Sequence, residues 1–197
     1  MLSSSFSSSP SIEIPAPGEK GADVGSLQNI EPLPFLSNYH IVATYECGLV
    51  SIFDIRSHRE PLMKRKLDDS ETLLSLDVWR SVLLVGDAGG NISMFHVSDP
   101  TGIIPLERIN ICKGVDSPCG IGCLGVREDG AITVACCWDY SVRVLETRSL
   151  EVKAILGDHN DTIMDVSFDR LTGDFATCSL DGNGYMWNLF SSSYKRL

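Results

Sequence analysis

The chain has 197 residues, which is long enough for a sizeable hydrophobic core, and its 43% hydrophobic and 21% charged residues are ordinary for a soluble globular protein. Its formal net charge of -10 argues against a protein whose main role is to bind nucleic acid or an anionic membrane surface. The Ser-rich amino-terminal segment lacks the basic and apolar regions of a signal peptide, and no apolar run approaches the roughly 18–20 residues that span a bilayer.

Residues 1–27 are rich in Ser, Pro and Gly, and they bury too little apolar surface to offset the entropy lost on ordering. We therefore expect this segment to be mostly disordered. One exception is the alternating run Ser11-Ile12-Glu13-Ile14, which has the pattern of a strand at a sheet edge.

Beyond this segment an apolar-x-x-apolar-x-apolar pattern occurs four times, beginning with Ile30, Leu33 and Phe35. The first members of the four sets lie 43, 48 and 42 residues apart: Ile30, Leu73, Ile121 and Ile163. The bulky residues expected to end each third strand have spacings of 42, 50 and 42: Phe53, Phe95, Leu145 and Trp187. Both sets of spacings are typical of propeller blades, which repeat every ~40–45 residues.

Short runs of β-branched and apolar residues are bounded by Gly, Asp and Asn throughout these repeats, and no segment has a sustained helical period. The sequence therefore predicts an all-β propeller of about four blades, at residues 28–67, 68–112, 113–156 and 157–190, followed by a short tail at 191–197. Pro32 and Pro34 fall in the first expected strand, where each removes a hydrogen-bond donor.

Four residues of the last repeat match the WD40 repeat, which this segment resembles: His159, Thr177, Asp181 and Trp187. Such residues form a buried network, because a buried indole N–H needs an acceptor and a buried carboxylate needs donors. Asp139 occupies the position of Asp181 in the third repeat, whereas Cys47 and Gly89 occupy it in the first two. We expect His159, Thr177, Asp181, Trp187 and Asp139 to have structural roles.

His159, Asp181 and Thr177 also have the residue types of a catalytic triad with Thr as the nucleophile. We favour the structural interpretation, because the spacing matches the WD40 network and nothing suggests an oxyanion site. The Gly-rich turn at residues 86–90 is a hairpin turn and not a phosphate-binding loop, since no helix follows it. We therefore expect no enzymatic activity and no cofactor.

Seven cysteines are present, and none forms a C-x-x-C pair. Cys119 and Cys123 have no second pair with which to complete a zinc site, so no metal is expected. Cys136, Cys137 and Cys178 lie in apolar, strand-like runs, where a free Cys behaves as a small buried hydrophobe. The odd number of cysteines, without a secretory signal, fits a reducing compartment and predicts a cytoplasmic or nuclear protein.

Four features occur in order toward the carboxyl end: Ala135, the pair Trp138-Asp139, the strand Val142-Arg143-Val144 and the run Trp187-Asn188-Leu189. In this order the run Cys119 to Phe190 resembles the group that contains guanine nucleotide-binding protein subunit beta-like protein 1 and the fungal ASTRA-associated protein 1. The resemblance implies a seven-bladed propeller, of which this chain would be a part. It also implies a subunit or cofactor of a TTT/ASTRA-type complex, which matures PI3-kinase-related kinases and associates with chromatin.

The resemblance does not imply binding of a Gγ subunit, because the amino-terminal coiled-coil helix of true Gβ subunits has no counterpart here. We expect the last blade to lack a fourth strand of its own, because only a few residues follow Leu189 in this sequence. The run Ile12-Glu13-Ile14 is the amino-terminal candidate to supply that strand and so to cover an open sheet edge.

The expected partners are other proteins of a multi-subunit complex. Trp138 and Tyr140 are candidate contact residues, since aromatic residues are enriched at interface hot spots. A local basic run supplies further candidates, with a solvated loop and strand as the alternative: Arg56, Arg59, Lys64, Arg65 and Lys66. The alternative function is a propeller that reads basic or modified peptides such as histone tails, which suit an acidic chain better than nucleic acid does.

Overall fold

The computed structural model describes residues 13–17, 24–57, 60–67, 71–99, 102–114 and 119–189. These residues form fifteen β-strands in four antiparallel sheets, and the described segments contain no helix. It follows that none of these segments forms a helix long and apolar enough to cross a membrane. The prediction of an all-β fold is confirmed.

In each sheet, strands that follow one another in the chain pair with one another. The first sheet consists of β1 (Leu27–Pro32), β2 (His40–Tyr45), β3 (Leu49–Asp54) and β4 (Met63–Lys66). The second consists of β5 (Leu73–Trp79), β6 (Val82–Asp87), β7 (Asn91–Ser98) and β8 (Gly102–Asn110). The third consists of β9 (Ile121–Val126), β10 (Ile132–Cys137), β11 (Val142–Glu146) and β12 (Glu151–Leu156). The fourth has three strands, β13 (Ile163–Phe168), β14 (Phe175–Ser179) and β15 (Gly184–Trp187).

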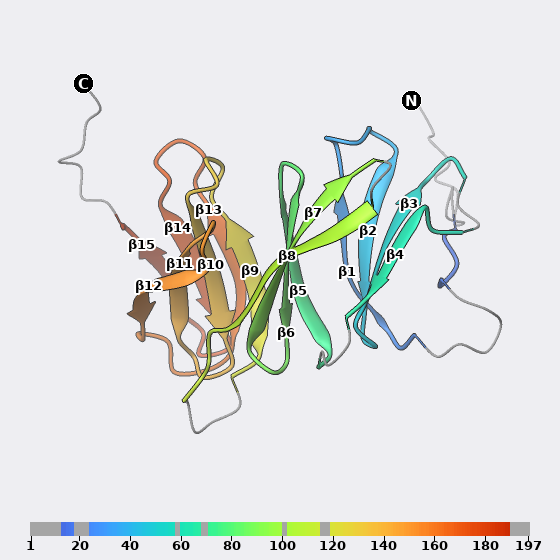
Figure 1. Cartoon of the computed structure of the whole chain (residues 1–197). Helices are drawn as coiled ribbons and strands as arrows, with labels where there is room; N and C mark the ends of the chain where they lie inside the picture. The colour runs from blue at the N-terminus through green and yellow to red at the C-terminus, as the bar shows by residue number, and fades with distance from the viewer. Residues whose placement is uncertain are drawn as a thin grey trace, which may run out of the picture.

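The four sheets stand side by side in a row, with the first and the fourth at opposite ends (Figure 1). Each pair of neighbouring sheets encloses its own apolar core. The second strands β6 and β10 are buried on both faces, which explains why their sequences are continuous apolar runs and do not alternate. The outermost strand β12 alternates between exposed and half-buried residues, because one of its faces meets solvent. This is the arrangement of propeller blades.

The first strand differs from its prediction. Leu27 pairs with Tyr45 as Leu73 pairs with Asp87, so the first repeat begins three residues before Ile30. Leu33 is fully buried, as expected of a core residue, but it follows the strand and lies in the turn toward β2. A buried turn residue is as apolar as a buried strand residue. The apolar pattern therefore placed the start of the first repeat three residues too late, at Ile30 and not at Leu27.

The prediction for the run Ile12-Glu13-Ile14 is wrong in its described part. Residues 13–16 have no regular secondary structure, and Ile14 packs against the outer face of the first sheet with Ala43 and Phe53. It therefore covers the first sheet and does not complete the fourth. Ser11 and Ile12 lie outside the described residues, as do most of residues 1–27 and all of 191–197.

The prediction for the cysteines holds for two of the three strand residues. Cys136 and Cys137 are buried, on opposite faces of β10, and each contributes to a different core. Cys178 is exposed, because its face of the fourth sheet is not covered by another sheet.

The contact between the second and third sheets leaves no room for a side chain at Gly86. A Cβ atom there would lie 2.7 Å from Cγ2 of Ile121 and would also meet the hydroxyl of Ser75. We expect Gly86→Ala to lower the free energy of unfolding by about 1–3 kcal/mol through overpacking, measured by urea denaturation. Gly157→Ala is the control, because its Cβ would meet nothing within 4 Å. Equal stability of Gly86→Ala and wild type would show that the two sheets are not packed in this way.

Candidate functional site

In the last blade, the four residues that resemble the WD40 set form a continuous chain of hydrogen bonds. Trp187 Nε1 donates to Thr177 Oγ1 at 2.8 Å, and that hydroxyl lies 2.8 Å from His159 Nε2. His159 Nδ1 lies 3.0 Å from Asp181 Oδ2. A neutral His159 with its proton on Nδ1 satisfies every group, because Nδ1–H donates to Asp181 and the Thr177 hydroxyl donates to Nε2.

Asp181 anchors this network to the backbone. Its carboxylate accepts N–H bonds from Asn160 at 3.0 Å and from Asn183 at 2.8 Å, in addition to the contact with His159. The bond from Asn160, followed by those from Asn183 and His159, lowers the pKa of Asp181 to about 2. The carboxylate is therefore ionised at neutral pH and ties the loop before β13 to the β14–β15 turn.

The burial of these groups argues against the triad interpretation. Thr177 is 3% exposed and its oxygen already accepts from Trp187, so a substrate carbonyl has no access to it. The His159 ring packs on Tyr185 with a centroid distance of 4.6 Å, and Trp187 stacks on Phe175. What the network does chemically is to satisfy its own polar groups and fix strand register.

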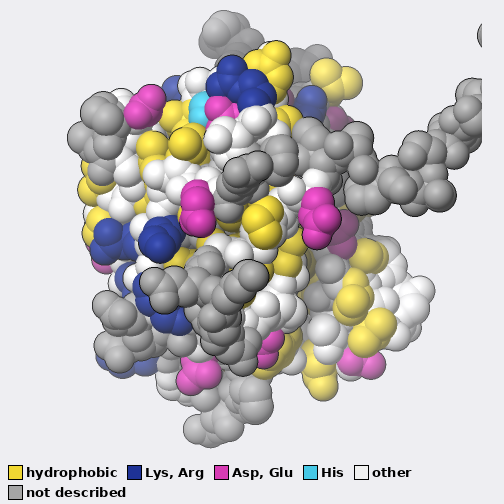
Figure 2. All heavy atoms as spheres, turned by 90° about the vertical axis from the view of Figure 1, so that its right-hand side faces the viewer, with side chains coloured by type: hydrophobic (Ala, Val, Ile, Leu, Met, Phe, Trp, Pro, Cys, Tyr) yellow, Lys and Arg dark blue, Asp and Glu magenta, His cyan; other side chains and the backbone are white. Residues whose placement is uncertain are grey.

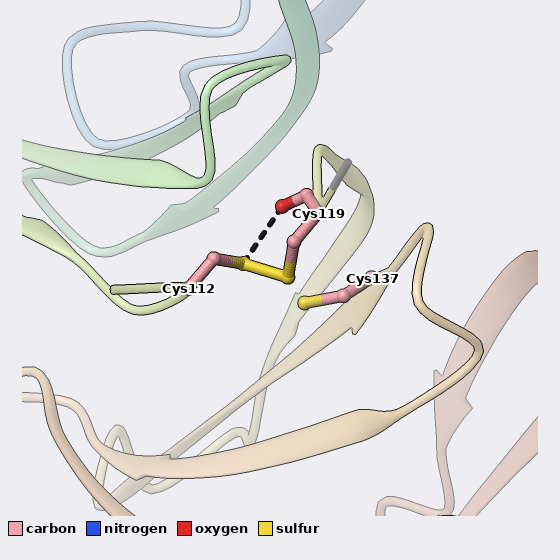
Figure 3. A group of neighbouring side chains, drawn as sticks. All are labelled: Cys112, Cys119 and Cys137. Carbon is pink, nitrogen blue, oxygen red and sulfur yellow. Dashed lines mark hydrogen bonds between the residues drawn. A yellow bond between two sulfur atoms is a disulfide. The ribbon is translucent and has the colours of Figure 1, made fainter. Parts of the chain in front are cut away.

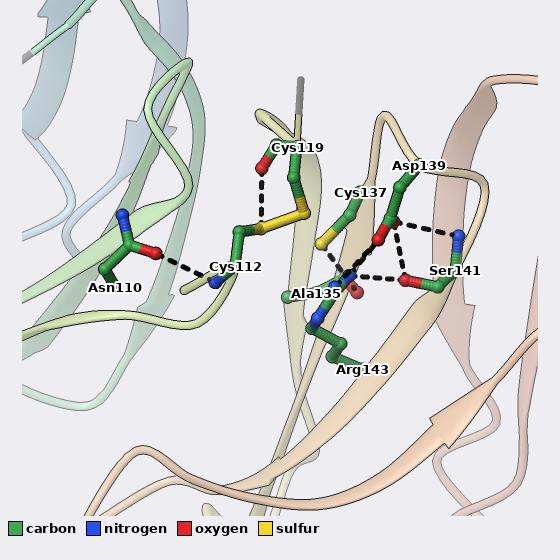
Figure 4. Close-up of polar contacts among 8 residues, drawn as sticks. All are labelled: Asn110, Cys112, Cys119, Ala135, Cys137, Asp139, Ser141 and Arg143. Atoms are coloured by element: carbon green, nitrogen blue, oxygen red, sulfur yellow. Dashed lines mark hydrogen bonds and ion pairs between the residues drawn. A yellow bond between two sulfur atoms is a disulfide. The ribbon is translucent and has the colours of Figure 1, made fainter. Parts of the chain in front are cut away.

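The third blade uses a different partner for its turn carboxylate. Asp139 accepts bonds from the Ser141 backbone and hydroxyl and forms an ion pair with Arg143 at 2.8 Å (Figure 4). Burial alone would raise the pKa of Asp139, but the bonds from Arg143 and Ser141 outweigh it and lower that pKa. Arg143 is paired with Ala135 in the register in which Tyr185 is paired with Thr177. An arginine thus stands where the last blade has an aromatic ring.

The second blade has a turn carboxylate that the sequence analysis did not find. Asp87 ends β6, two residues before Gly89, and accepts bonds from the backbone of Gly89 and from the backbone and side chain of Asn91. It also forms an ion pair with Arg108 at 3.3 Å. The Asp-x-x-x-Asn spacing around a Gly-Gly turn is the sequence signal that would have found it.

Trp138 and Tyr140 are presented by the turn that Asp139 holds. They are 37% and 43% exposed, and the Trp138 ring lies over the backbone of Gly120 and Gly122 at the start of β9. The backbone N–H of Trp138 donates to the Gly120 carbonyl at 2.9 Å. Tyr140 has a φ of 65°, a left-handed conformation that is uncommon for a bulky residue. Two exposed aromatic rings on a rigid turn form a candidate contact surface.

The described residues of the basic run do not form one cluster. Arg56 is paired with Asp54 at 2.6 Å and lies over the Tyr39 ring, and its bonds hold the pKa of Asp54 down at about 2. Arg65 faces the second sheet and donates to the Ile103 carbonyl at 3.2 Å. Lys64 and Lys66 are exposed and project from the other face of β4, because neighbouring residues of a strand alternate.

Arg59 lies outside the described residues. On the side of the molecule that carries the first sheet, Lys and Arg side chains form separate groups with acidic and hydrophobic side chains between them (Figure 2). Among the described residues on this side, the positive charges therefore do not form a single face.

An acidic hollow of about 440 Å³ lies where the innermost strands of the four sheets, β1, β5, β9 and β13, come together. Three carboxylates line it: Glu31, Asp77 and Asp165. Burial raises the pKa of Asp77 despite backbone bonds from Val126 and Val78, and burial together with Asp77 raises the pKa of Glu31. Both shifts would be relieved by a cationic ligand.

Comparison with known proteins supports the fold. No protein-family model matches the chain. The chain is similar to the solved β-propeller domain of Cps50 (Swd1) from Myceliophteria thermophila, with a TM-score of 0.74 and 16% identity. The similarity covers 90% of this chain and 59% of that domain's chain. At this identity the similarity shows the fold alone, a WD40-type β-propeller, of which the described residues form four blades.

The lowered pKa of Asp181 predicts a pH dependence of stability. A carboxyl whose pKa is depressed in the folded state stabilises it above the unfolded pKa of ~3.9, and this stabilisation is lost as the pH falls toward 2. We expect Asp181→Asn to be less stable than wild type at pH 7. The difference should shrink between pH 4 and 2, as measured by urea denaturation midpoints across that range. A difference that stays constant down to pH 2 would contradict the ionised network.

Proposed function

We propose that this chain is a non-catalytic WD40 propeller that serves as a scaffold for protein–protein interaction in the cytoplasm, the nucleus or both. The observation that carries the proposal is the turn with Trp138 and Tyr140. Bonds from Ser141 and Arg143 to Asp139 fix its backbone, so two large aromatic side chains reach solvent in a set conformation. Rigid exposed aromatic residues supply contact area at a low entropic cost.

We further propose that the partner complex is of the TTT/ASTRA type. The support is the resemblance of the last two blades to that group, which includes Trp138-Asp139 itself and the Arg143 strand that braces it. The residues that carry the resemblance therefore also build the exposed turn. Gγ is not among the proposed partners.

The test is recovery of TTT/ASTRA-type subunits with the tagged full chain from cells, measured by quantitative mass spectrometry. Loss of a hot-spot aromatic side chain costs about 2 kcal/mol or more, which is roughly 30-fold in affinity. We expect Trp138→Ala to reduce recovery accordingly. Leu171→Ala is the matched control, because Leu171 is 94% exposed in the β13–β14 turn, away from Trp138. Equal recovery with both variants, or no subunit recovered with the folded wild type, would overturn the proposal.

The alternative function, a reader of basic or modified peptides such as histone tails, is favoured by the acidic hollow. Glu31, Asp77 and Asp165 come from three different blades and face one space. For this function we expect a Lys/Arg-rich peptide to bind the purified chain in fluorescence anisotropy, more weakly as salt is raised. Asp165→Asn should weaken binding several-fold, and the exposed Asp158→Asn should not. Peptide affinity that is the same in both variants would exclude the hollow as the binding site.

A further inference from the structure

Three buried cysteines from two blades meet at one point. Cys112 follows β8, Cys119 precedes β9, and Cys137 is the last residue of β10. Their sulfur atoms all lie within 4.8 Å of one another, in the core between the second and third sheets (Figure 3). Sequence spacing gives no sign of this group, because the third sulfur is brought in by the pairing of β10 with β9.

The fold itself holds the three sulfur atoms in place. Cys112 N–H donates to Asn110 Oδ1 at 3.0 Å, which fixes the chain just after β8. The bond from the backbone N–H of Trp138 to the Gly120 carbonyl holds the end of β10 against the start of β9. Gly90, with a φ of 80°, lets the β6–β7 turn approach so closely that a Cβ atom there would lie 2.7 Å from Cys112 Cβ.

In this structure Cys112 and Cys119 form a disulfide, and Cys137 is a free thiol beside it. A dithiol reductant converts the disulfide to two thiols: two electrons and two protons pass to the cysteines, and the reductant becomes a disulfide. The reduced chain then has three thiols facing one buried space.

We propose that the reduced form of this three-cysteine cluster binds one thiophilic d10 metal ion, Zn²⁺ or Cu⁺, through all three sulfur atoms. Thiolates select these ions over hard cations. Sulfur atoms ~2.3 Å from a shared ion lie about 4 Å from one another, which the observed separation permits with small side-chain movements. On binding, three S–H bonds are broken, three metal–sulfur bonds form, and three protons pass to solvent.

A buried cation beside the cluster suits the negative charge that three thiolates bring. Arg143 is 3% exposed and its guanidinium lies next to the Cys137 thiol (Figure 4). Two of its nitrogen atoms bond to Asp139 or Ser141, whereas Nε has no hydrogen-bond partner within the described residues. The same arginine that braces the Trp138 turn therefore also borders the proposed site.

The cluster is separate from the other buried cysteine pair. Cys123 and Cys136 face each other across β9 and β10, in the core between the third and fourth sheets. They lie on the opposite face of the third sheet from Cys137, since Cys136 and Cys137 are neighbours in one strand. This pair supplies a control from the same strand.

The test is an anaerobic titration of the reduced full chain with Cd²⁺, followed by thiolate-to-metal absorption in the ultraviolet, then by competition with Zn²⁺ and, separately, with Cu⁺. We expect one ion per chain. Cys137→Ala should lower the affinity by more than the ~10–100-fold that loss of a supporting group costs. Displacement by Zn²⁺ or by Cu⁺ at lower concentration identifies the preferred ion, and displacement by either supports the proposal.

The controls are Cys136→Ala and Cys178→Ala, which should bind the ion as the wild type does. The chain with its disulfide intact should bind none, because it has one thiol at the cluster. Unfolding midpoints with and without the ion should differ for the reduced wild type and coincide for Cys137→Ala. The proposal is overturned if the folded, reduced wild type takes up no ion, if Cys137→Ala binds equally, or if the disulfide form binds as well.

Discussion

Each sheet of this chain depends on a neighbouring sheet to cover its apolar face. β6 and β10 are buried on both faces, so neither can be stable without sheets on either side. Polar bonds between innermost strands fix how the sheets meet: the Ser75 hydroxyl donates to the Ile121 carbonyl, and Asp77 accepts from the Val126 backbone. The positions of the turns and of the acidic hollow follow from this packing, because close-packed sheets cannot shift independently.

In three blades, a carboxylate accepts backbone N–H bonds in the turn between the second and third strands. A tight turn leaves backbone N–H groups that need an acceptor, and a carboxylate supplies it. Asp181 is held by His159, Asp139 by Arg143, and Asp87 by its own turn with Arg108. The partners differ from blade to blade, and the turn held by Asp139 and Arg143 is the one that carries the exposed Trp138 and Tyr140.

The period of the repeat and the all-β class were predictable, because strands buried on both faces produce apolar runs at a regular spacing. The residues of the last network were also identifiable from their types and order. The start of the first strand was not, since Leu33 is buried without being in a strand. Asp87 was missed because it lies two positions before the expected one. The basic run was named as one set of candidate contact residues. In the strand, however, Arg65 lies on the opposite face from Lys64 and Lys66, because side chains alternate.

The cysteine cluster was the least predictable feature, because Cys137 joins Cys119 and Cys112 from 18 and 25 residues further along the chain, which no local spacing encodes. Sequence analysis treats Cys137 as a core hydrophobe, and in packing terms it is one. Its chemistry arises only when the pairing of β9 with β10 sets it beside the two sulfur atoms that follow β8 and precede β9. The grouping of these three cysteines is therefore a property of the fold and not of the local sequence.

The fourth sheet is buried unequally on its two faces. Its inner face packs on the third sheet through Phe175 and Ile163, but its outer face leaves Cys178 and Met186 exposed, with Met186 71% accessible. The first sheet, by contrast, has Ile14 and Val24 over its outer face. Because the outer face of the fourth sheet is less buried, packing specifies its register less strongly than it does in the second and third sheets. The bonds among His159, Thr177 and Trp187 add to the specification of that register.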